Sequence, residues 1–144
     1  MQTVLSIMNR LFAVILFAVW FSISANAADN PRWALNELTD QGFFTLALQP
    51  KDGEPVIGDF HDWIIEVTDE NGKGIENAEF RFDGGMAAHG HGLPSQPTVT
   101  QYLGEGKYLI EGLLFNMAGD WTLMVAVKKG SFIDTAQFVM TLDF

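Results

Sequence analysis

The chain has 144 residues, and its 18 acidic against 8 basic side chains give it a formal net charge of −10 at pH 7. This balance disfavours a nucleic-acid partner, because phosphate binding needs a basic face. The chain has no cysteine, which excludes disulfides, thiolate zinc sites and cysteine-based catalysis, so the core must be held by packing of apolar and aromatic side chains.

The N-terminal segment has the pattern of a secretory signal peptide. The first ten residues carry one positive charge and no acid, residues 11–23 are uncharged, and Ala25 and Ala27 fit the small-residue rule for cleavage. A spanning helix needs about 20 apolar residues, so a retained membrane anchor is the weaker alternative, and the lack of cysteine excludes a lipoprotein anchor. We expect cleavage after Ala27 and a periplasmic mature domain of residues 28–144.

Beyond this signal peptide (residues 1–27), the sequence predicts short strands separated by turns. Asn30 and Pro31 favour a short helical turn. Segments that alternate in hydropathy and end at Gly, Pro or Asn-Gly signals are expected to be strands; in chain order they are 42–48, 60–68, 75–82, 98–103, 107–115, 121–129 and 132–142. About seven strands with regular turns predict an all-β fold, an immunoglobulin-like antiparallel β-sandwich.

A long irregular loop is expected over residues 84–97, and it holds two of the three histidines. Loops of this length are commonly functional or disordered. His89 and His91 are two residues apart, which places both imidazoles on one side of an extended segment, and Met86 lies three residues before His89. Imidazole and thioether donors form a soft ligand set that selects copper, chiefly Cu(I). We therefore predict a copper site at Met86, His89 and His91.

Two further side chains are candidates to complete this site. Met117 lies in a predicted turn, residues 116–120, which meets the loop if both lie at the same end of a sandwich. His61 shares a strand face with Trp63 and is either a buried, hydrogen-bonded histidine or a ligand. The whole set also has a structural alternative, because His-Gly-His fits an ordinary polar turn and methionine often fills core space. Met124 and Met140 are expected in the core.

An enzymatic function is not predicted. The sequence has no nucleophile elbow, no Gly-rich phosphate loop and no cysteine, and no carboxylate pair stands out from the acidic surface. A three-histidine zinc centre of His61, His89 and His91 remains an alternative. Copper binding by an N-terminal histidine is excluded, because cleavage after Ala27 leaves Ala-Asp-Asn at the new terminus.

Five motifs follow one another along the chain: His61-Asp62-Trp63, Gly84-Gly85-Met86 with His89-Gly90-His91-Gly92-Leu93-Pro94, Gly104-Glu105-Gly106-Lys107-Tyr108, Glu111-Gly112, and Phe115-Asn116-Met117-Ala118-Gly119-Asp120-Trp121. In this order they resemble the YtkA-like domain, which is related to the FixH family of exported bacterial proteins. The resemblance covers roughly residues 56–142. It departs from the family at Ala87, where proline is common.

The resemblance implies an immunoglobulin-like sandwich outside the cytoplasm and a suspected copper role, near copper-handling or oxidase-assembly proteins. The resemblance implies Met86, His89 and His91 as ligands directly. It implies His61 and Met117 by their positions in the motifs. We expect a periplasmic copper-binding carrier, chaperone or resistance protein. The alternative is a non-catalytic module that docks to a periplasmic or membrane protein through residues 84–97, and a metalloenzyme ranks last.

Overall fold

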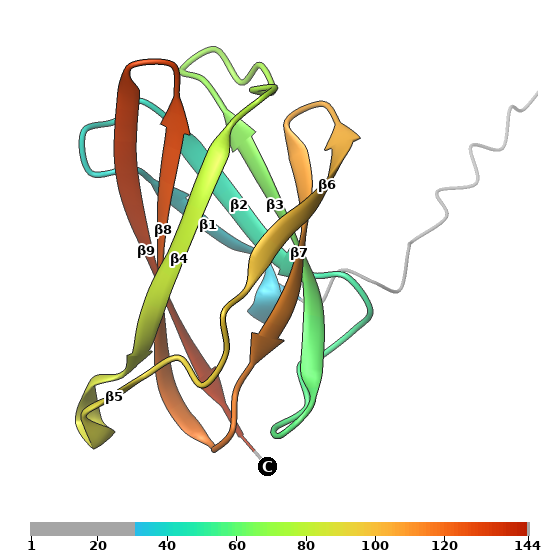
Figure 1. Ribbon diagram of the computed structural model, residues 1–144, viewed down its shortest axis with the longest axis vertical. Coiled ribbons are helices and arrows are strands. Elements are labelled where there is room, and N and C mark those ends of the chain that lie inside the picture. The colour runs from blue at the N-terminus through green and yellow to red at the C-terminus, as the bar shows by residue number, and fades with distance from the viewer. Residues whose placement is uncertain (1–30, 144) are drawn as a thin grey trace, which may run out of the picture.

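The computed structural model describes residues 31–143, which form two antiparallel sheets packed face to face (Figure 1). The predicted signal peptide and its cleavage site lie outside the described residues. Among residues 31–143, no helix is long and apolar enough to cross a membrane. The elements in chain order are η1 (Pro31–Trp33), β1 (Leu35–Leu38), β2 (Thr45–Pro50), β3 (Phe60–Thr68), β4 (Glu79–Met86), η2 (Ala87–His89), β5 (His91–Gly92), β6 (Thr98–Gly104), β7 (Lys107–Leu114), β8 (Gly119–Lys129) and β9 (Phe132–Leu142).

The strand order confirms the predicted immunoglobulin-like sandwich. One sheet has the order β1-β2-β3-β7-β6, and the other has the order β5-β4-β8-β9. Strands β2, β3, β7 and β6 stand where an immunoglobulin domain has A, B, E and D, and β4, β8 and β9 stand where it has C, F and G. Strand β5 adds a short edge beside β4, and β1 extends the edge beside β2.

The described chain has nine strands rather than the expected seven, because β1 and β5 were not predicted. The expectation of one irregular loop over 84–97 is therefore wrong at its start, where β4 continues to Met86 and pairs with β5. The expected strand start at residue 75 is also wrong. Asn77 has a positive φ of 54°, a conformation that breaks a strand, and β4 begins only at Glu79.

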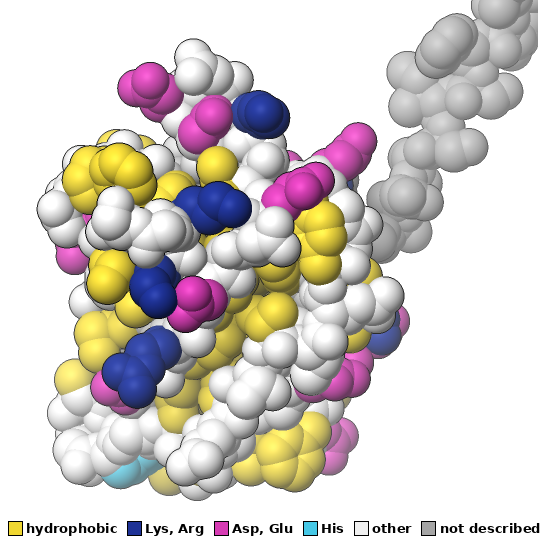
Figure 2. Space-filling view, turned by 45° about the horizontal axis from the view of Figure 1, so that its top comes forward, with side chains coloured by type: hydrophobic (Ala, Val, Ile, Leu, Met, Phe, Trp, Pro, Cys, Tyr) yellow, Lys and Arg dark blue, Asp and Glu magenta, His cyan; other side chains and the backbone are white. Residues whose placement is uncertain are grey.

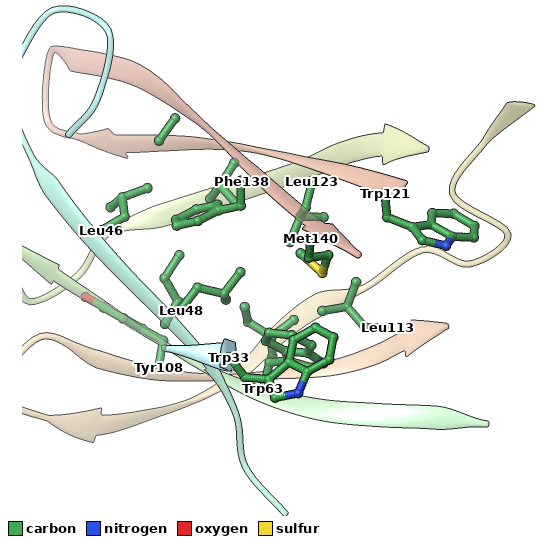
Figure 3. Packing of buried hydrophobic residues seen from close by; sticks show 14 of the residues in the cluster. Trp33, Leu46, Leu48, Trp63, Tyr108, Leu113, Trp121, Leu123, Phe138 and Met140 are labelled. Carbon is green, nitrogen blue, oxygen red and sulfur yellow. The ribbon is translucent and has the colours of Figure 1, made fainter. Parts of the chain in front are cut away.

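Inward-facing residues of both sheets form one core (Figure 3). The predicted inner face of β3 is confirmed at Trp63, Ile65 and Val67, which are fully buried. Met140 is buried as expected, but Met124 is 37% exposed. The core expectation was wrong for Met124 because the odd-numbered residues from 121 to 127 point inward on β8, which leaves position 124 on the outer face.

On the face shown in Figure 2, charged side chains of both signs are interspersed rather than collected in one patch. The ion pairs join exposed or half-exposed groups, such as Lys128 and Glu79 with 3.1 Å between Nζ and Oε2. Pairs of this kind contribute little to stability. Histidine atoms are visible at the lower end of the face in Figure 2.

Candidate metal centre

Three segments meet at one end of the sandwich: the end of β4, the short strand β5, and the turn between β7 and β8 (lower part of Figure 1). The sequence left open whether the turn and the histidine segment adjoin. They do, because the Met86 side chain reaches the turn. A β-carbon on Gly119 would lie only 2.7 Å from the Cε methyl of Met86, so the absence of a side chain at this position leaves room for the thioether.

Met86 and His91 are direct partners across the β4–β5 pair. Partners in an antiparallel pair project from the same face of the sheet, and Met86 is buried on that face. Gly85, the preceding residue on β4, makes the close pairing possible. Its φ is +146°, and a β-carbon there would collide with the backbone of His91 and Gly92.

A hydrogen bond fixes which ring nitrogen of His91 is protonated. Nδ1 lies 3.0 Å from the carbonyl oxygen of Gly92. A carbonyl can only accept a hydrogen bond, so Nδ1 carries the hydrogen, and in the neutral ring Nε2 keeps a lone pair. This Nε2 atom is buried and has no hydrogen-bond partner among the described residues.

An unpartnered buried acceptor is uncommon in folded proteins and calls for an explanation. Three other buried side-chain atoms in residues 31–143 lack partners: the indole nitrogens of Trp33 and Trp63 and the hydroxyl of Ser95. The indoles carry N–H donors, whereas His91 Nε2 is a lone-pair nitrogen of the kind that binds metal ions. Fixing of the other ring nitrogen by a backbone carbonyl is also typical of metal-binding histidines.

Trp121 forms the inner wall of this end of the sandwich. Gly85 pairs with Thr122, so the next position along each strand sets Met86 beside Trp121. The rings of His91 and Trp121 approach to 5.7 Å between centroids, across the strand that carries Met86. The indole Nε1 donates to the carbonyl oxygen of Met117 at 3.0 Å, which ties the β7–β8 turn to the same place.

His89 lies nearer the surface than Met86 and His91. It ends the turn η2 and is exposed, and its ring centroid is 6.1 Å from that of His91. The turn is closed by the N–H of Gly90, which donates to the carbonyl oxygens of Met86 and Ala87. Ala87 opens η2, a first helical position that also suits proline, so the departure from the family pattern leaves the turn intact.

His61 lies on β3, in the other sheet, and its ring is held by its own loop. Its Nε2 lies 2.7 Å from the carbonyl oxygen and 3.0 Å from the nitrogen of Val56. The β3–β7 register also shifts between His61 and Trp63, which sets His61 apart from the buried face that the sequence assigned to it. Within residues 31–143, no three His, Asp or Glu side chains form a group that could hold a metal ion. The alternative of a three-histidine zinc centre is therefore wrong.

The structure thus brings Met86, His91, His89 and the Met117 turn to one end, and does not group His61 with the other histidines. A model of the YtkA-like family matches residues 43–126. The chain belongs to the YtkA-like family. Comparison with curated proteins and with solved structures gives no match.

The YtkA-like match spans all the candidate ligands and most of β8, and it bears out the family that the sequence motifs indicated. The relation to FixH stays a prediction. The sequence did not predict that Trp121 lies beside His91, although Trp121 ends one of the YtkA-like motifs. Its proximity to His91 depends on the pairing of β4 with both β5 and β8, which no local pattern reveals.

Proposed function

We propose that this YtkA-like protein is a non-catalytic copper-binding module of the periplasm that carries Cu(I). Its central donors are the sulfur of Met86 and Nε2 of His91, with His89 as the third. The observation that supports this most directly is the buried, unpartnered Nε2 of His91 on the strand that pairs with Met86. The Met117 side chain, half-buried against the core, is a candidate to take the place of His89 as the third donor.

The chemistry of the donors favours Cu(I) over other common ions. A thioether is a soft ligand suited to copper, whereas Mg²⁺ and Ca²⁺ bind through oxygen ligands. No described carboxylate forms a three-residue group with His89 and His91. The net charge of −10 also raises the local concentration of cations near the surface.

The graded exposure of the donors supports a carrier or chaperone role. His89 is exposed, His91 is half-buried and Met86 is buried. An ion held this way is reached from one side only, at the end of the sandwich that carries His89. Binding that keeps one accessible donor allows stepwise exchange of ligands with another protein, which a fully closed site would prevent.

Titration of the purified protein with Cu(I) against a competing chelator tests the proposal. We expect one ion per chain, with an affinity tighter than micromolar. His91→Ala should weaken binding by at least the roughly tenfold that loss of an outer-shell partner of a metal ligand costs, and Met86→Leu should also weaken it. His61→Ala is the matched control and should bind as the wild type. Weak micromolar binding, or binding unchanged by His89→Ala with His91→Ala, would contradict the proposal.

The alternative, docking to a protein partner without metal, has one observation in its favour. Residues 84–104 contain no Lys, Arg, Asp or Glu, and Phe60, at the start of β3 beside the end of β7, is 70% exposed. The segment that carries the histidines is therefore uncharged, and an exposed aromatic side chain lies at the same end of the sandwich. Retention of one defined membrane or periplasmic protein that survives a copper chelator, and is lost with Phe60→Asp, would favour docking.

A further inference from the structure

We infer that Trp121 is a specificity-determining residue of the candidate metal centre. Its indole forms a wall that donates no electron pair, and it restricts the site to soft monovalent ions that accept two or three ligands. This inference rests on the proposed function and deepens it, because it states which ions the same site accepts and which it rejects.

Trp121 belongs to a row of side chains that crosses one sheet. His91 on β5 pairs with Met86 on β4, and Trp121 on β8 pairs with Met140 on β9. The register between β4 and β8, carried one residue past Gly85 and Thr122, places Met86 beside Trp121. Both proposed central donors therefore lie next to the indole on the inner face of one sheet.

The indole is fixed in this position. Trp121 is fully buried, its ring lies 5.2 Å from that of Phe115 between centroids, and its Nε1–H is engaged by the carbonyl oxygen of Met117. Figure 3 shows the ring at the end of the core, beyond Leu113 and Met140. Dense packing resists rotation of a side chain of this size, so the indole cannot withdraw to admit another ligand.

A wall of this kind discriminates between ions by the number and hardness of the ligands they need. Zn²⁺ takes four nitrogen, sulfur or oxygen ligands in a tetrahedron, and Cu²⁺ prefers a tetragonal set of nitrogen and oxygen ligands. The indole cannot supply a ligand to either ion, because its one polar atom, Nε1, is a hydrogen-bond donor that already bonds the carbonyl oxygen of Met117. It can attract a cation through the face of the ring, which adds to binding without adding a ligand.

The test compares Ag⁺ with Zn²⁺ on the purified protein, since Ag⁺ is a soft monovalent ion that does not change oxidation state in air. Affinities are measured by competition for the wild type, Trp121→Phe and Trp121→Leu. We expect the wild type to bind Ag⁺ far more tightly than Zn²⁺. In Trp121→Leu the ratio of the two affinities should fall by about tenfold or more, and Trp121→Phe should lie between.

Tryptophan fluorescence supplies a second readout, the quenching of emission by Ag⁺, which loss of packing alone would not change. Ag⁺ should quench the emission of the wild type, and most of this quenching should disappear in Trp121→Phe. Trp63→Phe is the matched control, because Trp63 is equally buried but lies on β3 of the other sheet; it should retain both the quenching and the selectivity. Circular dichroism checks that each variant folds. If Trp121→Leu does not fold, the selectivity and quenching of Trp121→Phe decide the test.

The outcomes separate this inference from the proposed function. If the wild type binds Ag⁺ and Cu(I) but the Trp121 variants keep the same selectivity and quenching, Trp121 is only a core residue and the inference is overturned while the function stands. If the wild type binds neither ion, both are overturned.

Discussion

The carboxylate of Asp134 is buried, and within residues 31–143 it is stabilised by hydrogen bonds and not by an ion pair. Its carboxylate accepts the backbone N–H groups of Gln41 at 3.0 Å, Thr135 at 2.9 Å and Phe43 at 3.3 Å. Burial alone would raise the pKa of Asp134, but these bonds and the Thr39 hydroxyl outweigh it and hold the pKa below its usual value. The charge thereby fixes the β1–β2 loop against β9.

The depressed pKa of Asp134 sets a pH dependence of stability. Its contribution is fully present above the unfolded-state pKa of about 3.9 and is lost as the pH falls through the lower folded-state value. We expect Asp134→Asn to reduce the free energy of unfolding by about 2 kcal/mol at pH 7, and the deficit to shrink below about pH 4. Urea unfolding at several pH values measures this. Asp59→Asn, at an exposed position, is the control, and a deficit that does not change between pH 7 and pH 3 would contradict the explanation.

Strands that have an alternating pattern between clear turn signals were predicted well, and the two-residue strand β5 was missed. The sequence located β9 exactly as observed and β8 to within two residues, because eleven alternating residues and a glycine turn specify each of them locally. Strand β5 has two residues and forms only through its pairing with β4, so no local sequence pattern predicts it. The residues of the candidate site also fall into those that the sequence predicts and those that it does not. Met86, His89 and His91 are neighbours in sequence and were found together, whereas the Trp121 contact and the displacement of His61 depend on pairing between distant strands.

The β4–β5 pair gives a prediction about a single element. In Gly85→Ala the new methyl group would meet the backbone of β5, which cannot yield as a flexible side chain would. We expect the free energy of unfolding to fall by about 2–3 kcal/mol and the affinity for Cu(I) to fall by at least about tenfold, because His91 moves with β5.

Gly90→Ala is the matched control for that substitution. Gly90 also has a positive φ, +67°, but a β-carbon there would meet nothing within 4 Å. We expect a loss of about 1 kcal/mol from backbone strain alone and no change in affinity for Cu(I). Chemical unfolding and chelator competition measure the two quantities, and equal losses of affinity in both variants would show that the spacing of β4 and β5 does not position the ligands.

The acidic surface of this protein complicates any measurement of metal binding. A net charge of −10 destabilises the folded state by self-repulsion, so any cation that collects at the surface can raise stability without occupying a site. A specific ion acts differently, because it binds the folded state alone and stabilises it in proportion to the logarithm of its concentration. The two effects can be separated by comparing ions at equal ionic strength.

We therefore predict that Cu(I) raises the midpoint of thermal unfolding of the wild type far more than Mg²⁺ does at equal ionic strength. A free concentration 100 times the dissociation constant adds about 2.7 kcal/mol, which for a domain of this size corresponds to roughly 10 °C. Mg²⁺ should give only the small increase that screening of surface charge produces. In His91→Ala, which keeps the acidic surface, a roughly tenfold weaker affinity should reduce the Cu(I) increase to about half, and a larger loss of affinity should reduce it further toward the level of Mg²⁺. An increase that is the same for both ions, or is retained in full in His91→Ala, would assign the effect to the surface charge and not to the site beside Trp121.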